Sequence, residues 1–427
     1  MMQNVLIFPS DTEIAREIFD SLRYNKLFSL IGASSTNGKG ELLNYNKHVS
    51  NLPFISDPDF ILTLNERCIE YNIHFIFPCH DDVCYFLTKH KNEISAQIVS
   101  HSYRINQICR SKEQTYKFLL DENYLPKINP SNFPMFVKPK EGYGSKNVRK
   151  VDNSEELEYY FKHNSYQNSI VCEYLPNEEY TVDCFSISGE LIFHGARNRR
   201  IAKMGIAEIS EKVIESKISD IALRINNKFK QVGGFHGAWF FQLKKDVNNQ
   251  FKLLEIGPRI SGGMSFYRMC GDINFAEASI SILNSSSFNL PSHSKVDIKK
   301  FGKYFIPLFK FEKVNFDNVY VDFDDTLFLH SEKMMNTELI MFLYQCVNDN
   351  KKIILITRSK FDFIEILKSF KLFQLFDEII HITDGSVKAN FIRENSIFID
   401  DSFKERNFFH ETIHCFGIDN FKVLIRN

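Results

Sequence analysis

Short apolar runs alternate with helical patterns over the first hundred residues of the chain. Three of these runs are typical of buried strands, namely VLIF (5–8), FSLIG (28–32) and FIFP (75–78). The segments 12–24 and 81–90 have the spacing of amphipathic helices. Strand–helix alternation of this kind predicts a parallel sheet covered by helices, so we expect an α/β domain at residues 1–100.

The pattern changes after residue 100 and changes again near residue 315. Longer alternating strands, such as YTVDCFSI (180–187) and AWFFQL (238–243), predict an α+β domain over residues 101–312. The lysine-rich stretch 295–313 is interpreted as the end of that domain and a connection. Over residues 315–427 four short β-rich runs alternate again with helical segments, at 318–323, 352–358, 378–382 and 396–401. The last stretch therefore predicts a small, doubly wound α/β domain, and the whole chain is multidomain, α/β and α+β.

Composition narrows the class of protein. At 427 residues the chain exceeds one ordinary core, since domains average roughly 150 residues. A net charge of −1 gives no attraction to nucleic acid or to a membrane surface, which favours small-molecule partners. The start has no leader pattern, and no apolar run reaches the length of about 20 residues that a spanning helix needs. Nine scattered cysteines without a CxxC pair indicate reduced, mostly buried thiols and a cytoplasmic location.

The run FVKPKEGYGSKNV (136–148) has the pattern of a phosphate-binding loop. A strand leads into Lys138, and a loop with Gly142, Gly144 and Ser145 follows. Glycines let successive backbone N–H groups approach an anion, and the lysine adds a positive charge. No GK[ST] follows the glycines, so this is not a Walker A loop. A glycine turn beside an exposed lysine is the alternative.

Polar residues at strand positions further along suit a nucleotide with its metal ion. VCEYLPNEEYTVDCF (171–185) contains Glu173 and, after a short turn, Glu179. AWFFQL supplies Gln242, and LLEIGPRISGG (253–263) supplies Glu255 and Arg259. Oxygen ligands at the ends of two neighbouring strands suit Mg²⁺ bound to a triphosphate. A structural Glu–Gln pair is the alternative.

Residues 1–310 resemble the ATP-grasp superfamily, especially its carbamoyl-phosphate-synthase-like and amino-acid-ligase branches. The resemblance rests on RSKEQTYKFL, KPKEGYGS, CEYLPNEEYTVD and EIGPRISGG in this order. It implies a pre-ATP-grasp α/β domain followed by an ATP-grasp domain, with ATP and Mg²⁺ or Mn²⁺ as cofactors. The implied contacts are Lys112 and Lys138 with the phosphates, Glu173 and the backbone of Tyr174 and Leu175 with adenine, Glu179 with ribose, Gln242 and Glu255 with the metal, and Arg259 with the transferred phosphoryl group.

This resemblance also implies a reaction. A carboxylate attacks the γ-phosphate of ATP to give an acyl phosphate, and an amine then displaces the phosphate. Arg197, Arg199 and Arg200 lie where relatives carry a substrate-side loop, so they are candidates to bind an anionic group, with a solvated loop as the alternative. The family usually has asparagine where this chain has Gly257, which we interpret as an altered metal geometry.

The run VYVDFDDTLFLH (319–330) is the sharpest signature of the chain. An apolar strand ends in Asp322 and Asp324, and such strand ends face the carboxyl edge of a parallel sheet. One aspartate can attack phosphorus while the other protonates the leaving oxygen. Leu327 and the preceding apolar strand exclude an EF-hand loop. Thr357 suits a phosphate oxygen, Lys388 can neutralise charge, and the Asp400–Asp401 pair suits Mg²⁺.

These four motifs resemble the haloacid dehalogenase (HAD) superfamily. The resemblance implies that Asp322 is the nucleophile, Asp324 the acid/base and Thr357 and Lys388 the phosphate binders. The metal set is Asp322, Asp324 and Asp400, with Asp401 in support. The close spacing of the motifs leaves no room for a large cap, and the acid/base aspartate favours hydrolysis. A decayed module retained for packing is the alternative.

Together the motifs predict a bifunctional enzyme, a carboxylate–amine ligase fused to a phosphatase. Its partners are small carboxylates and amines and a phosphorylated metabolite, without nucleic acid or membrane, and a homodimer is compatible with the sequence. Two alternatives stay open: a small-molecule kinase or carbamoyl-type phosphoryl transferase, and a nucleotide-binding regulatory protein in which only the phosphatase is active.

Overall fold

The chain forms two compact units, Met1–Ile306 (the N-terminal unit) and Pro307–Asn427 (the C-terminal unit). The structure is a computed structural model. It describes residues 2–36, 38–43, 45–142, 146–199, 201–203, 206–284, 300–302, 314–409, 413–418 and 421–426. Most of the predicted connection at 295–313 lies outside these residues.

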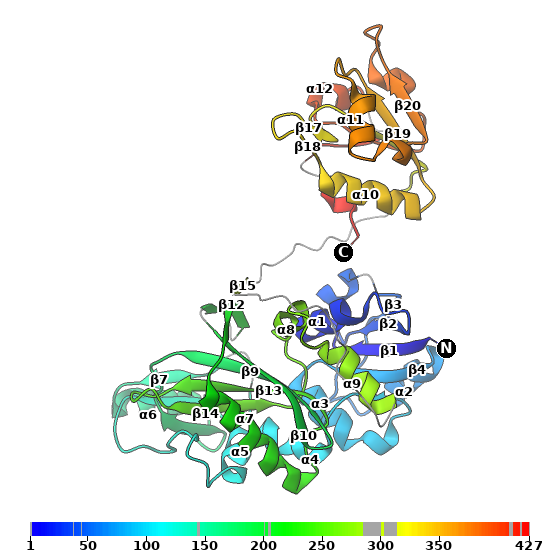
Figure 1. Cartoon of the computed structure of the whole chain (residues 1–427). Coiled ribbons are helices and arrows are strands. Elements are labelled where there is room, and N and C mark those ends of the chain that lie inside the picture. The colour runs from blue at the N-terminus through cyan, green and yellow to red at the C-terminus, as the bar shows by residue number, and fades with distance from the viewer. Residues whose placement is uncertain are drawn as a thin grey trace. The chain divides into compact units, whose positions relative to one another are not determined.

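The N-terminal unit begins with a five-stranded parallel sheet, drawn mostly in blue in Figure 1. Its strands, in spatial order, are β3 (Lys47–Val49), β2 (Phe28–Ala33), β1 (Gln3–Phe8), β4 (Ile73–Pro78) and β5 (Gln97–Ile98). Val5, Leu6 and Ile7 are fully buried, as expected of a central strand covered on both faces. The parallel sheet expected from the sequence is confirmed.

Three helices contact this sheet, namely α1 (Glu13–Leu22), α2 (Phe60–Glu70) and α3 (Asp81–Lys89). The first begins at Thr12, whose side chain accepts a hydrogen bond from the backbone N–H of Ala15. The last part of the unit returns to α1 through α8 (Ser265–Met269) and α9 (Phe275–Asn284). There Arg268 forms an ion pair with Glu17, at 2.8 Å. The α/β part and the segment after residue 258 therefore stabilise each other.

Two antiparallel sheets follow the parallel one. A three-stranded sheet has the order β7 (Arg149–Val151), β6 (Met135–Pro139) and β8 (Ser169–Glu173). The larger sheet has the order β11 (Ile201–Lys203), β12 (Ile206–Val213), β10 (Glu190–Asn198), β9 (Glu179–Ile187), β13 (Gly237–Lys245) and β14 (Phe251–Gly257), and β15 (Lys300–Gly302) pairs with β12. The helices of this part are α4 (Tyr103–Arg110), α5 (Lys112–Phe118), α6 (Ser154–His163) and α7 (Ser216–Phe229).

A buried histidine links the segment before α4 to the start of β13. His101 lies before α4, and its Nδ1 accepts a hydrogen bond from the backbone N–H of His236, at 3.1 Å. Its Nε2 therefore carries the proton and donates to the carbonyl oxygen of Ala238, at 2.8 Å. Both ring nitrogens are thus used by a neutral imidazole, and burial lowers the pKa of His101 to about 4.

The C-terminal unit contains a second parallel sheet. Its strands, in spatial order, are β20 (Glu378–His381), β19 (Lys352–Thr357), β16 (Asn318–Val321), β21 (Ser396–Ile399) and β22 (His414–Phe416). The chain runs outward from β16 to one edge and then returns to the other, which is the doubly wound order. Helices α10 (Thr337–Asn348), α11 (Phe363–Ser369) and α12 (Phe403–Arg406) lie in the connections. Between β16 and α10 the chain forms only a short hairpin, β17 (Phe328–Leu329) with β18 (Met334–Met335).

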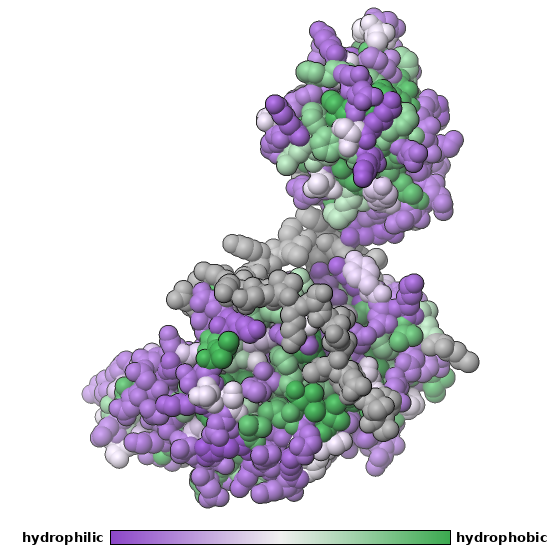
Figure 2. Space-filling model, in the orientation of Figure 1, coloured by the Kyte–Doolittle hydropathy of each residue, from purple (hydrophilic) through white to green (hydrophobic). Residues whose placement is uncertain are grey.

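The visible surface is mostly polar and the cysteines are unpaired, as the composition predicts. Polar side chains cover most of the visible face of each unit, with apolar ones between them (Figure 2). All nine cysteines are free thiols, and only Cys415 is not buried. Within the described ranges, no helix is both long enough and apolar enough to span a membrane.

Candidate functional site

The N-terminal unit contains a cavity of about 180 Å³ that strands of both antiparallel sheets line. Most of the residues selected from the motifs contribute to its wall. These are Lys112, Lys138, Gly142, Glu173, Tyr174, Leu175, Glu179, Arg199, Gln242 and Glu255. Gly144, Ser145 and Arg200 lie outside the described residues. Motif residues separated by well over a hundred positions in the sequence therefore meet at one cavity.

A β-bulge fixes the polar end of this cavity. Gln242 pairs with Glu255 and Leu243 pairs with Leu253, so Leu254 is an extra residue in β14. Directly opposed residues of an antiparallel pair present their side chains on the same face. Gln242 and Glu255 thus project together, from positions inside the strands and not from the strand ends that the sequence suggested.

The carbonyl oxygen of the bulge residue holds Lys138 in place. Lys138 Nζ donates to the Leu254 oxygen at 3.3 Å and to the hydroxyl of Tyr116 at 2.9 Å. That hydroxyl in turn donates to the Leu254 oxygen at 2.8 Å. Lys138 itself is only 6% exposed, so its charge is directed at the cavity and not at bulk solvent. Sequence spacing gave no indication that Tyr116 would hold Lys138 in place.

Lys112 approaches the Glu255 carboxylate from the start of α5. Its Nζ lies 3.5 Å from Glu255 Oε2 and donates to the carbonyl oxygen of Gly142 at 3.3 Å. Ser111 caps the helix by accepting a hydrogen bond from the N–H of Gln114, which sets the direction of this first turn. The two lysines and Glu255 form a charged group suited to a polyanion with a bound cation.

The two other glutamates, Glu173 and Glu179, also line the cavity. Glu173 Oε1 accepts a hydrogen bond from the backbone N–H of Lys127, at 2.8 Å. Glu179 Oε1 lies 3.0 Å from Arg199 Nε, and Glu179 Oε2 lies 3.8 Å from Lys244 Nζ. Burial lowers the pKa of Arg199, although Glu179 opposes the shift. Lys244 was missed from the sequence, where it is one lysine among many.

Arg259 does not line this cavity. Its Nε and Nη2 donate to the two carboxylate oxygens of Asp81, at 2.7 and 2.8 Å. Burial disfavours the charged carboxylate, but the guanidinium outweighs burial and lowers the pKa of Asp81 to about 2. Arg259 thus forms an ion pair with α3 in this structure, and its predicted contact with a phosphoryl group stays a prediction. Arg197 is likewise buried, with its Nε 2.8 Å from Asp183 Oδ2.

Gly257, where the resemblance implied an asparagine, lies against an aromatic side chain. Phe240 is directly opposite Gly257 in the sheet. A Cβ atom on Gly257 would lie 2.3 Å from Cε1 of Phe240, so the aromatic ring occupies the space that a side chain would need. The guanidinium of Arg259 lies over the same ring, 5.3 Å from its centroid.

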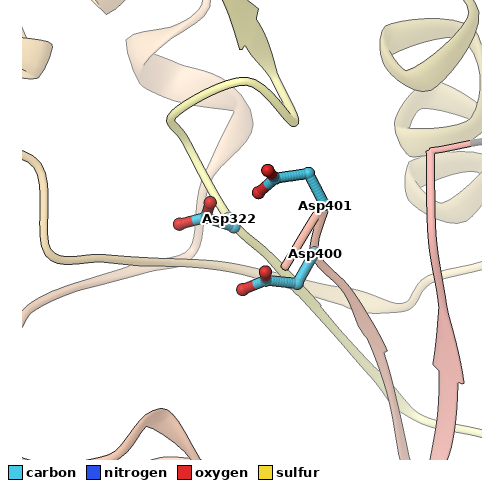
Figure 3. A group of neighbouring side chains, drawn as sticks. All are labelled: Asp322, Asp400 and Asp401. Atoms are coloured by element: carbon cyan, nitrogen blue, oxygen red, sulfur yellow. The ribbon is translucent and has the colours of Figure 1, made fainter. Parts of the chain in front are cut away.

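A second cluster of charged residues lies in the C-terminal unit. Asp322 follows β16, and Asp400 and Asp401 follow the neighbouring strand β21 (Figure 3). Each offers one carboxylate oxygen within 4.8 Å of the others. Lys388 Nζ donates to Asp322 Oδ1 at 2.6 Å and to Asp400 Oδ2 at 2.7 Å.

The acidity of these groups follows from burial and mutual repulsion. Burial raises the pKa of Asp322 to about 7, with Lys388 opposing the shift and Asp400 adding to it. Burial likewise raises the pKa of Asp400. One lysine thus faces a group of close carboxylates, which provide the oxygen ligands that Mg²⁺ prefers. A divalent cation would offset their repulsion, so the residues present fit a metal site.

Hydroxyl groups complete the arrangement. Thr326 Oγ1 donates to Asp401 Oδ1 at 3.2 Å, and the fully buried Thr357 ends β19, beside β16. Asp324 is not part of the acidic trio: its Oδ1 lies 2.6 Å from His330 Nε2 and accepts a hydrogen bond from Ser359 Oγ at 3.0 Å. The sequence suggested Asp324 among the metal ligands and gave no signal for His330.

The architecture of the N-terminal unit is the ATP-grasp fold. Residues 165–301, less than half of the chain, match a family model described as "ATP-grasp in the biosynthetic pathway with Ter operon". No curated protein gave a significant match.

Among solved structures, the biotin carboxylase of Campylobacter jejuni is 17% identical with a TM-score of 0.56, covering 68% of this chain and 72% of that one. The L-amino acid ligase of Bacillus licheniformis is 16% identical with a TM-score of 0.53, covering 66% and 73%. The N5-carboxyaminoimidazole ribonucleotide synthetase of Thermotoga maritima is 16% identical with a TM-score of 0.52, covering 69% and 78%. At these identities the similarity establishes the fold alone.

Proposed function

We propose that the N-terminal unit is an ATP-dependent ligase that joins a carboxylate to an amine through an acyl phosphate. The observation that carries the proposal is the single cavity in which two lysines face the Gln242–Glu255 pair. Proteins of similar fold include an L-amino acid ligase, and a carboxyaminoimidazole synthetase among them was solved with ADP. Both facts support a nucleotide-dependent ligase.

The lining residues fit ATP and a hard divalent cation. Lys112 and Lys138 would hold the phosphates, the Glu173–Leu175 segment would hold the base, and Glu179 would hold the ribose. Gln242 and Glu255 provide oxygen atoms on one face of the sheet, and Glu255 is 35% exposed, so a cation has access to it. Mg²⁺ bound there would supply neutralisation of phosphate charge. The Tyr116 hydroxyl and the Leu254 carbonyl fix Lys138, so little reorganisation accompanies charge transfer.

Release of ADP tests the ligase. The full chain is incubated with ATP, Mg²⁺ and pools of amino acids and small carboxylates, as wild type and as Lys138→Ala. The matched control is Lys217→Ala, an exposed lysine on α7. We expect ADP release that requires one carboxylate and falls about 100-fold or more in Lys138→Ala, as for loss of a group that stabilises developing charge. ADP release that is equal in both variants would contradict the proposal.

The product separates the ligase from the two alternatives. An amide with free phosphate supports the ligase, whereas a stable phosphorylated product indicates a kinase or carbamoyl-type transferase. Tight ATP binding without turnover for any carboxylate indicates a regulatory nucleotide-binding unit.

We further propose that the C-terminal unit is a HAD-type phosphatase acting on a phosphorylated metabolite of the same pathway. The supporting observation is the Lys388 bridge between Asp322 and Asp400 beside a third carboxylate. Asp322 attacks phosphorus and Asp324 protonates the leaving oxygen; water then attacks the aspartyl phosphate while Asp324 takes up a proton. Mg²⁺ bound by Asp322, Asp400 and Asp401 would supply neutralisation of the phosphoryl charge.

Phosphate release from a panel of phosphoesters tests this second proposal. We expect activity that requires Mg²⁺, is lost on chelation and is lost in Asp322→Asn. The control Asp349→Asn removes an aspartate from the exposed end of α10, where it pairs with Arg426. Activity that survives in Asp322→Asn would refute the assignment of the nucleophile.

A further inference from the structure

The β17–β18 hairpin brings the chain back to Asp324. Asp325 has a positive φ of 51°, and its N–H donates to the carbonyl oxygen of Phe328 at 2.8 Å. Its carboxylate accepts a hydrogen bond from the backbone N–H of His330, at 3.1 Å. The loop after β16 is therefore folded tightly, and His330, six residues after Asp324, returns to contact it.

Two side chains hold the same oxygen of Asp324. His330 Nε2 lies 2.6 Å from Asp324 Oδ1, and Ser359 Oγ donates to that oxygen at 3.0 Å. Within the described part of the chain, the hydrogen bonds to this carboxylate all reach Oδ1. The carboxylate is about one-third exposed and the imidazole one-quarter exposed, so solvent reaches the group.

Both partners of Asp324 are themselves fixed. The ring of His330 packs between Phe361, with centroids 4.5 Å apart, and Phe328, with centroids 5.0 Å apart. Ser359 is 4% exposed, its N–H donates to Thr357 Oγ1 at 3.0 Å, and its Oγ accepts a hydrogen bond from the N–H of Phe361 at 3.2 Å. The carboxylate is thus held between the hairpin and the end of β19.

We infer that His330 is a positioning residue for Asp324, an inference that rests on the proposed phosphatase function. Because His330 and Ser359 hold Oδ1, Oδ2 is the atom that exchanges the proton. In the first step Asp322 bonds to phosphorus, the bond from phosphorus to the leaving oxygen breaks, and that oxygen takes the proton from Oδ2. In the second step water bonds to phosphorus, its proton goes to Oδ2, and Asp322 is released with phosphate.

The test compares leaving groups that need different amounts of protonation. The variants of the full chain are His330→Phe, which keeps an aromatic ring between Phe328 and Phe361, and His330→Gln, which keeps an N–H donor. The control is His414→Gln, an exposed histidine on β22. The substrates, with Mg²⁺, are 4-nitrophenyl phosphate, whose leaving group needs little protonation, and phenyl phosphate, whose leaving group needs more.

We expect His330→Phe to lower kcat for phenyl phosphate about 10-fold while changing kcat for 4-nitrophenyl phosphate by less than about 2-fold. His330→Gln should keep most of the activity on phenyl phosphate, and the control should match wild type. Equal losses on both substrates, a change in KM alone, or no change would overturn the inference.

A second measurement separates this inference from the phosphatase proposal. In ¹⁵N-histidine NMR of the full chain, we expect the imidazole signals of His330 to shift in Asp324→Ala and to stay unchanged in Asp349→Asn. No shift in Asp324→Ala would overturn the contact itself. Wild-type chain that releases no phosphate from any ester, with the shift present, would reject the phosphatase and leave a purely structural contact.

Discussion

Replacing Gly257 by alanine tests whether the Phe240 ring occupies the space that a side chain at position 257 would need. A Cβ atom there would lie 2.3 Å from Cε1 and 2.4 Å from Cζ of Phe240, whose ring is 5% exposed. Gly257 has no positive φ, so backbone strain does not contribute. Overpacking of a buried site costs about 1–3 kcal/mol. That cost exceeds the gain of roughly 0.5–1 kcal/mol that alanine brings over glycine inside a strand, so we expect net destabilisation.

Urea unfolding of a double-mutant cycle measures this clash. The cycle combines Gly257→Ala with Phe240→Leu, because leucine lacks the ring atoms that the new Cβ would meet. We expect the double variant to be more stable than the sum of the single effects by about 1 kcal/mol or more. As a control, Gly257→Ala is combined with Phe251→Leu at the other end of β14, where we expect additive effects. The reasoning fails if Gly257→Ala is as stable as wild type, or if its effect is additive with Phe240→Leu.

Three further predictions follow from titratable groups away from bulk solvent. Because burial lowers the pKa of His101 to about 4, its contribution to stability is present above the unfolded pKa and is lost as the pH falls. Between about pH 7.5 and pH 5 we expect the free energy of unfolding to fall by about 2 kcal/mol because of this group, and His101→Gln should abolish that fall. Urea unfolding at several pH values measures it, and the same pH dependence in both chains would contradict the prediction. Asp81→Asn leaves the Arg259 guanidinium, which is 14% exposed, without its carboxylate partner, so urea unfolding should report a loss of about 1–3 kcal/mol; a free energy of unfolding equal to that of wild type would contradict the prediction. Lys388→Met removes the ammonium group that lies between Asp322 and Asp400. Mg²⁺ should therefore raise the melting temperature of this variant more than that of wild type, and equal shifts would argue against Mg²⁺ binding at these carboxylates.

Local pattern was sufficient to predict the central strands of both parallel sheets. The runs at 5–8 and 352–358 appear as β1 and β19 within a few residues, because continuous apolar segments between turn signals have few alternatives to a buried strand. Motif order grouped Lys112, Lys138 and Glu255 in one predicted site, and all three line the same cavity.

The remaining features depend on pairings that no local pattern contains. Arg259 and Asp81 are 178 residues apart, so sequence spacing could not show that a carboxylate of α3 would form an ion pair with Arg259. The contact of Phe240 with Gly257 depends on the register of β13 and β14, which side-chain packing and the turn decide. His330 was missed because its contact with Asp324 requires a turn with positive φ at Asp325, a position where glycine or asparagine is the usual signal.

The bulge at Leu254 makes the number of residues in β14 a property of the candidate ATP site. Removing Leu254 would restore regular pairing with Glu255 still opposite Gln242, but it would also remove the carbonyl oxygen to which Lys138 and Tyr116 donate. A substitution at Leu254 keeps this backbone oxygen, whereas deletion of its codon removes the acceptor that positions Lys138. We therefore expect insertions and deletions in evolutionarily related chains to fall in the turn at residues 246–250, where the length of the chain is not tied to the cavity.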